Sequence, residues 1–177
     1  MVNVGIVYGV TAFGLARRLG VSNKEADEII TGYKTRFAGI TTFLEECIAQ
    51  AKDLGYVETM LKRRRPIPDI DSNQPNRRSL AERMAINSVV QGSAADLIKL
   101  AMIDLHARVE SDRATDGNAL SDVLMLLQIH DELVFEAPVD GAAAARAVIV
   151  DRMQRAMTLD VPLVVDSGIS GNWFEAK

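Results

Sequence analysis

Residues 123–136 read VLMLLQIHDELVFE, two apolar runs separated by three polar residues. Apolar runs of this length predict strands, here over 123–129 and 133–135. Only His130, Asp131 and Glu132 lie between them, which leaves room for nothing longer than a tight turn. The two strands are therefore expected to pair as an antiparallel hairpin.

Helical patterns surround this hairpin. Residues 93–110 place apolar side chains on one helical face, and residues 140–158 form an alanine-rich helical stretch. A turn is expected at Asp116–Asn118, a last strand at Leu163–Ile169, and a turn at Gly171–Trp173. A small antiparallel sheet backed by helices is an α+β fold, and this is the fold class that the sequence predicts.

The first half of the chain is mainly helical in pattern. Thr11 is expected to cap a helix that stops at Gly20, and Ser22 to open a helix that reaches Phe37. A further helix over about 40–54 ends at Gly55. The remaining expectations are a strand at Tyr56–Leu61, an exposed loop over 62–78, and a helix from Ser79 that is interrupted at Gly92.

Composition bounds the class of protein. Hydrophobic residues make up 48% of the 177 residues, enough for a core, and no apolar run reaches the ~20 residues that span a bilayer. The N-terminus lacks the basic stretch of a signal peptide. The single cysteine, Cys47, excludes an internal disulfide and fits a reducing cytoplasm. These features predict a cytoplasmic protein without a membrane partner.

Charge is divided unevenly along the chain. The net charge is −4, yet residues 1–88 carry 13 lysines and arginines against 10 acidic residues, and residues 89–177 carry 7 against 14. A basic half could grip phosphates while an acidic half holds cations. Two ordinary solvated surfaces would give the same count.

The polar tip of the predicted hairpin is a candidate metal site. Mg²⁺ takes oxygen ligands, often one or two protein carboxylates plus substrate phosphates. Neighbouring side chains of a strand point to opposite faces, so Asp131 and Glu132 are not expected to hold one ion together. The alternative is that these acidic residues only form the turn.

Several separate stretches resemble one family. Residues 82–99, ERMAINSVVQGSAADLIK, resemble a signature helix of family A (bacterial DNA polymerase I type) DNA polymerases. Gln91 stands 39 residues before His130, a spacing that resembles that of the family. Residues 3–9, NVGIVYG, resemble the end of the fingers helix. Further likenesses lie in GYVET at 55–59 with Arg63–Arg65 and Pro68–Asp69, in LDVPL at 159–163, and in GNW at 171–173.

The resemblance implies a domain plan and a metal. Residues 1–78 would be the C-terminal part of the fingers, and residues 79–177 part of the palm. Asp131 would be one of two carboxylates that hold the catalytic Mg²⁺ pair, with Glu132 as a supporting carboxylate and His130 beside the primer terminus. The substrates would be primer-template DNA and deoxynucleoside triphosphates.

The resemblance also implies DNA contacts. Asn87 and Gln91 would reach the minor groove, whose acceptors are nearly the same for every base pair. Tyr8 would stack near the templating base, and Arg83 would hold the backbone. Otherwise Asn87 and Gln91 could cap the break at Gly92, Tyr8 could be a core aromatic and Arg83 a solvated side chain. The basic stretch could neutralise phosphates or stay solvated, through Arg63, Arg64, Arg65 and Arg78.

The sequence departs from the family in three respects. No stretch of the type Asp-Tyr-Ser-Gln-Ile-Glu, which carries the family's other metal-binding aspartate, occurs here, and the triphosphate-clamping residues should precede Asn3. Val4 replaces an aromatic residue that contacts the incoming sugar. Lys62 and Val89 replace a common glycine and a common proline. We therefore expect the chain alone to lack turnover.

Other interpretations remain open on the sequence. The chain could be a non-catalytic remnant that binds primer-template DNA, or one piece of a split polymerase. An unrelated metal hydrolase using His130, Asp131 and Glu132 is a third possibility, although His106 is the only other histidine. A sheet without its central strands should expose edges and apolar faces, so we expect self-association or marginal stability.

Overall fold

The computed structural model describes the backbone of residues 2–115 and 117–176, with side chains from Gly5 onward. Contacts divide the chain into two compact units, one up to Ser93 and one from Ala94. Helix α5, Pro75–Arg113, contributes to both. The expected division into fingers and palm after residue 78 concerns functional regions of the family and stays a prediction.

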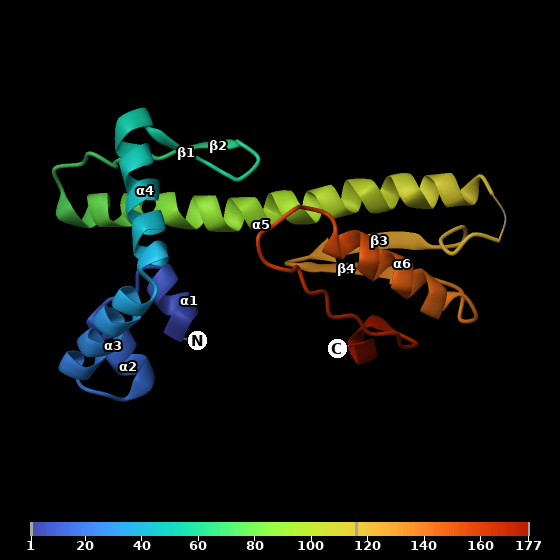
Figure 1. Cartoon of the computed structure of the whole chain (residues 1–177), viewed down its shortest axis with the longest axis horizontal. Coiled ribbons are helices and arrows are strands. Elements are labelled where there is room, and N and C mark those ends of the chain that lie inside the picture. Colours follow the sequence, from blue (N-terminus) through green and yellow to red (C-terminus); the bar gives the residue numbers. More distant parts are fainter. Residues whose placement is uncertain (1, 116, 177) are drawn as a thin grey trace. The chain divides into compact units, whose positions relative to one another are not determined.

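The first unit begins with four helices, α1 Val2–Val7, α2 Ala12–Leu19, α3 Asn23–Arg36 and α4 Ala38–Leu54 (Figure 1). The predicted caps are confirmed. The Thr11 hydroxyl accepts a hydrogen bond from the Gly14 backbone, and Gly20 ends α2 in the left-handed conformation at φ 69°. Ser22 opens α3, and α4 starts two residues before its predicted position and ends at Gly55.

A short hairpin follows α4. Strand β1, Tyr56–Glu58, is shorter than predicted and pairs antiparallel with β2, Arg64–Pro66. The prediction of a loop over 62–78 is therefore partly wrong. Strand β2 lies within this range, and α5 begins at Pro75, before the range ends. Backbone pairing tolerates the polar composition of β2, and proline is well suited to the first position of a helix.

One of the buried clusters of the first unit joins α4, this hairpin and the start of α5. Its buried members are Ala51, Val57, Ile67, Ile70, Ala81 and Ala85, with Met84 and Val89 packed against them. Burying a side chain such as Val57 stabilises the fold by about 1.5–3 kcal/mol. The core thus fixes the face of the hairpin that meets α5.

Helix α5 is continuous for 39 residues, so the predicted interruption at Gly92 is wrong. Glycine inside a helix costs about 1 kcal/mol relative to alanine. Gly92 is tolerated because a Cβ there would lie 2.7 Å from Cγ2 of Thr59, closer than real atoms approach. The glycine serves a close approach of two segments and does not break the helix.

The second unit contains the predicted hairpin. Strands β3, Leu124–Ile129, and β4, Glu132–Glu136, pair antiparallel, with a bulge between Met125 and Leu127. Helix α6 covers Ala142–Gln154, shorter than predicted. The turn expected at 171–173 is a bend leading into the 3₁₀ helix η1, Trp173–Ala176. The turn expected at 116–118 includes Asp116, which lies outside the described residues.

The strand predicted over Leu163–Ile169 does not form. A strand needs a hydrogen-bonding neighbour, and within the described ranges β3 and β4 pair only with each other. The α+β fold is otherwise confirmed.

Buried groups from α5, α6 and the segment between α5 and β3 form the core of the second unit, with β4 packed against them. Val109, Leu120, Val123 and Ala145 are buried, and Phe135 packs against them. Asp112 is also buried; it pairs with Arg108 at 2.7 Å and accepts a hydrogen bond from the Leu120 backbone at 3.2 Å. Among the described helices, none is both long enough and apolar enough to cross a membrane.

Candidate functional site

The β3–β4 turn consists of two residues, His130 and Asp131. Glu132, predicted to lie in the turn, is instead the first residue of β4 and pairs with Ile129. His130 has a φ of 52°, a left-handed conformation that non-glycine residues adopt only a few per cent of the time. The Gln128 side-chain amide donates a 2.6 Å hydrogen bond to the His130 carbonyl. This bond and the strand pairing hold the turn in one conformation.

Asp131 is exposed at this turn, and it makes no ion pair with any described residue. Glu132 lies on the strand, on the same face as its partner Ile129. The described residues contain no group of three histidine, cysteine, aspartate or glutamate side chains that could hold a metal ion. The turn thus exposes one carboxylate, that of Asp131, next to the imidazole of His130.

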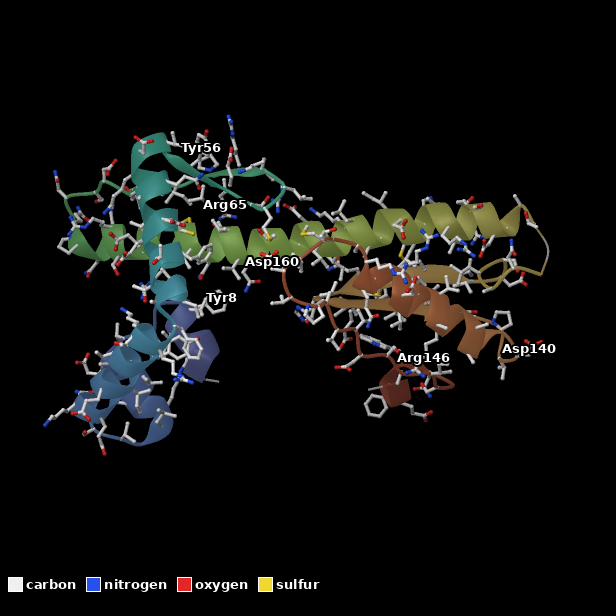
Figure 2. All side chains as sticks on the ribbon, viewed as in Figure 1. Tyr8, Tyr56, Arg65, Asp140, Arg146 and Asp160 are labelled. Carbon is white, nitrogen blue, oxygen red and sulfur yellow. The ribbon has the colours of Figure 1, made fainter. Side chains whose placement is uncertain are left out.

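A second group of predicted residues lies on one face of α5 in the first unit. Arg83, Asn87 and Gln91 follow one another at intervals of four, so they share a helical face. Tyr8, in the turn after α1, lies near α5 (Figure 2). The Gln91 amide donates a 2.5 Å hydrogen bond to the Tyr8 hydroxyl, and a Cβ on Gly9 would lie 3.4 Å from Cγ of Arg83. The structure therefore brings Tyr8, Arg83 and Gln91 together.

Asn87 lies between these residues on the helix and is half-buried. Its side-chain oxygen is buried and has no hydrogen-bond partner among the described residues. A buried polar atom without a partner costs about 1–3 kcal/mol. The unpaired atom is a hydrogen-bond acceptor, so it needs a donor, and the sequence alone gave no sign of this.

The alternative that Asn87 and Gln91 cap a helix break at Gly92 is wrong, because α5 does not break there. The alternative that Tyr8 is a core aromatic is also wrong, since its ring is only half-buried and its hydroxyl bonds to the exposed Gln91. Both corrections leave these polar groups available for a function.

The predicted DNA-binding arginines differ in their surroundings. Arg63 donates a 3.1 Å hydrogen bond to the Gly92 carbonyl. Arg64 pairs with Glu58 at 3.0 Å and lies over the Tyr56 ring, 4.7 Å from its centroid. The exposed side chains of Arg65 and Arg78 make no ion pair or hydrogen bond with the described part of the chain.

The family model for DNA polymerase family A matches residues 1–175. The chain belongs to DNA polymerase family A. Among its relatives, the DNA polymerase I of Bacillus caldotenax is 47% identical over 176 residues, which is 99% of this chain and 19% of that protein. The thermostable DNA polymerase I of Thermus filiformis is 42% identical over 99% of this chain and 20% of its own length. The chain thus spans about a fifth of the length of these family A relatives.

A solved structure gives the same assignment. The POL domain of Pol1 from M. smegmatis, in complex with DNA primer-template and dNTP, has a TM-score of 0.86 to this chain at 38% identity. It covers 98% of this chain, which covers 30% of that one. The interpretation as an unrelated metal hydrolase is therefore wrong, because the family A match includes the residues on which it depended.

Sequence reasoning missed the contact between the β1–β2 hairpin and α5. Besides the Arg63 bond to Gly92, the buried Ser93 hydroxyl accepts a 2.9 Å hydrogen bond from the Met60 backbone. Gly92 was the available signal, since a glycine inside a helical pattern often marks a close packing contact.

Proposed function

We propose that these 177 residues are a segment of a template-directed DNA polymerase, which adds deoxynucleotides to a primer 3′-hydroxyl. The main support is Asp131, an exposed carboxylate on a rigid two-residue turn in a chain that matches family A over residues 1–175. Primer-template DNA and dNTP are the proposed substrates, since the similar POL domain is described in complex with both. The bacterial relatives support a cytoplasmic location.

The residues at this turn fit Mg²⁺. A single exposed carboxylate suits an ion that uses few protein ligands and completes its shell with substrate phosphates and water. Asp131 would hold the ion, and Glu132 would support it from the start of β4. When bound, Mg²⁺ stabilises the charge on the oxygens that attack and leave during nucleotidyl transfer.

The polar face of α5 would contact the DNA. The side-chain N–H groups of Gln91 and Asn87 would donate hydrogen bonds to minor-groove acceptors, which test the geometry of a base pair without reading its sequence. The unpaired Asn87 oxygen cannot bond to these acceptors and would need a separate donor. Tyr8 would stack on a base, and Arg83 would neutralise a backbone phosphate. His130 would lie beside the primer terminus, since it adjoins Asp131 in the turn.

We expect the 177 residues alone to bind primer-template DNA without extending it. Catalysis of phosphoryl transfer depends on positioning and on charge stabilisation. Two metal ions need more carboxylates than the one that the β3–β4 turn presents. The same residues should become active inside a complete polymerase.

A chimaera tests the proposal. The matching segment of the Bacillus caldotenax enzyme is replaced by this chain, and primer extension with Mg²⁺ and four deoxynucleotides is compared with an Asp131→Ala variant. The control is Asp140→Ala, which removes an exposed carboxylate from the turn before α6 (Figure 2). Extension by the chimaera and the control, but not by Asp131→Ala, is the expected result.

Two other results would contradict this assignment. Extension that survives Asp131→Ala would mean that this carboxylate does not hold the catalytic ion. A folded chimaera that binds primer-template DNA but never extends it would favour a non-catalytic DNA-binding segment.

A further inference from the structure

The three consecutive arginines of the β1–β2 hairpin are sorted by the strand register. Arg64 stands opposite Glu58, whereas Arg65 stands opposite Val57. Residues paired across an antiparallel ladder lie on the same face. Because Val57 packs into the core with Ala81 and Ala85 of α5, Arg65 leaves the hairpin on the α5 side, and Arg64 leaves it on the other.

Their partners differ in the same way. Arg64 is held by the Glu58 carboxylate and by the Tyr56 ring, and Lys62 also pairs with Glu58, at 3.7 Å. The Arg63 guanidinium bonds to Gly92. Arg65 stays exposed although it lies on the core side, and no described residue pairs with it. Arg65 is therefore the one arginine of the three whose charge has no partner in the described part of the chain.

The hairpin is docked on α5 directly after Gln91. Hydrogen bonds across the contact include one from Arg63 to the Gly92 carbonyl and one from the Met60 backbone to the Ser93 hydroxyl. The Thr59 methyl group occupies the space that a side chain at residue 92 would need. The contact therefore places the hairpin beside the residue that is proposed to reach the minor groove.

We propose that the β1–β2 hairpin is a phosphate-binding element in which Arg65 alone of the three arginines contacts the nucleic-acid backbone. Arg63 and Arg64 are positioning residues: Arg63 fixes the hairpin to α5, and Arg64 keeps its outer face folded on Glu58 and Tyr56. The ligand is a backbone phosphate of the duplex whose minor groove Gln91 contacts. This inference rests on the proposed DNA-binding function and adds to it a division of roles among the arginines.

Salt dependence separates a phosphate contact from a structural role. Removing one contact should flatten the plot of log affinity against log salt by about 0.9, and should weaken binding roughly five- to tenfold near 0.1 M salt. We expect this for Arg65→Gln in the 177-residue chain and in the chimaera, measured by fluorescence anisotropy with a labelled primer-template. Arg36→Gln, an equal charge change at the end of α3, should leave the slope unchanged.

The positioning residues should behave differently. Arg64→Gln should lower the melting temperature and leave the salt slope within error of the starting protein. Arg63→Lys keeps the charge but loses the guanidinium geometry, so it should weaken binding without reducing the charge on the hairpin.

The docking contact has its own test. Gly92→Ala favours the helix by about 1 kcal/mol in intrinsic propensity, so a loss of DNA affinity in a folded variant would come from the displaced Thr59. Adding Thr59→Ser removes the obstructing methyl and leaves 3.5 Å to the nearest remaining atom, Nη2 of Arg63. The double variant should regain the affinity, whereas Gly92→Ala alone should make Arg65→Gln nearly silent.

The outcomes distinguish the proposed DNA binding from the proposed role of Arg65. If neither the chain nor the chimaera binds primer-template DNA, the proposed function fails, and this inference fails with it. If both bind and Arg65→Gln leaves the slope unchanged, Arg65 does not contact a phosphate, and only this inference is overturned. Full affinity in folded Gly92→Ala would show that the docking contact does not position the hairpin.

Discussion

The side-chain amide of Gln91 donates a 2.5 Å hydrogen bond to the phenolic oxygen of Tyr8, across 83 positions of sequence. The bond joins the turn after α1 to the middle of α5. It links the ring proposed to stack on a base with the amide proposed to reach the minor groove. Tyr8 therefore has two separable parts, a ring that offers stacking area and a hydroxyl that holds Gln91.

Two substitutions of Tyr8 separate these parts. Tyr8→Phe keeps the ring and releases Gln91, so primer-template affinity should stay within about threefold, because an exposed hydrogen bond contributes roughly 0.5 kcal/mol. Tyr8→Ala also removes the ring and should weaken binding by about 1–3 kcal/mol. Equal losses in both variants, measured by anisotropy, would assign the effect to the hydroxyl and contradict stacking.

The left-handed backbone at His130 predicts which residues the β3–β4 turn accepts. Asparagine and glycine adopt this conformation readily, so His130→Asn and His130→Gly should fold with unchanged hairpin register. His130→Val should destabilise the protein by about 1–2 kcal/mol, because a β-branched side chain crowds the following carbonyl. Urea unfolding midpoints measure the difference, and equal stability of the valine and asparagine variants would be incompatible with this turn geometry.

Acid should weaken the start of α3. Hydrogen bonds from the Ser22 backbone and then from its hydroxyl lower the pKa of Glu25 below its usual 4.5. A carboxyl whose pKa is lowered by folding stabilises the folded state above its ordinary pKa, and this stabilisation is lost as pH falls through the folded value. Glu25→Gln should therefore reduce the drop in melting temperature below about pH 4.5. An unchanged acid profile would show that the carboxylate adds nothing to the cap.

Two ion pairs of the second unit have the same spacing and distance but different burial. Arg108–Asp112 and Arg155–Asp151 are both four residues apart at 2.7 Å, with the aspartate side chains 4% and 52% exposed. Asp112→Ala should cost about 2–4 kcal/mol, because the Leu120 backbone N–H and Arg108 lose a buried acceptor. Asp151→Ala should cost under about 0.5 kcal/mol. Similar losses in chemical unfolding would mean that burial does not set the contribution.

The outward face of the β3–β4 hairpin should make the isolated chain self-associate. Leu124, Leu126 and Leu127 are 46%, 50% and 41% exposed on β3, and apolar patches of this kind favour association. Light scattering should show a mass that rises with concentration, and Leu127→Glu should reduce it. Leu80→Glu, at an exposed site on α5 in the first unit, serves as the control. A clean monomer at high concentration would contradict the prediction.

Local signals in the sequence were sufficient for the caps and for the β3–β4 hairpin. Thr11, Ser22 and Gly55 act through their own backbone neighbourhoods, so their roles follow from residue type and position. The same holds for the hairpin, where the apolar runs and the short spacer define the pairing. Glu132 was predicted in the turn but belongs to β4, because strand pairing extends up to the two-residue turn.

Features that depend on distant residues could not be predicted. Gly92 looks like a helix breaker until Thr59, far away in sequence, is seen to fill the space beside it. Leu163–Ile169 has the composition of a strand, but composition does not supply a pairing partner. The sequence likewise indicated Asn87 and Gln91 as candidate DNA contacts. It could not show that Asn87 has a buried unpaired oxygen or that Gln91 is bonded to Tyr8.

The two-residue turn between β3 and β4 also restricts how this segment can evolve. Inserting or deleting one residue there would move every following side chain of β4 to the opposite face. Glu132 and Glu136 would then turn toward the core that now holds Phe135. We therefore expect homologous sequences to vary in residue type along β4 but to keep the number of residues between Gln128 and Phe135 constant.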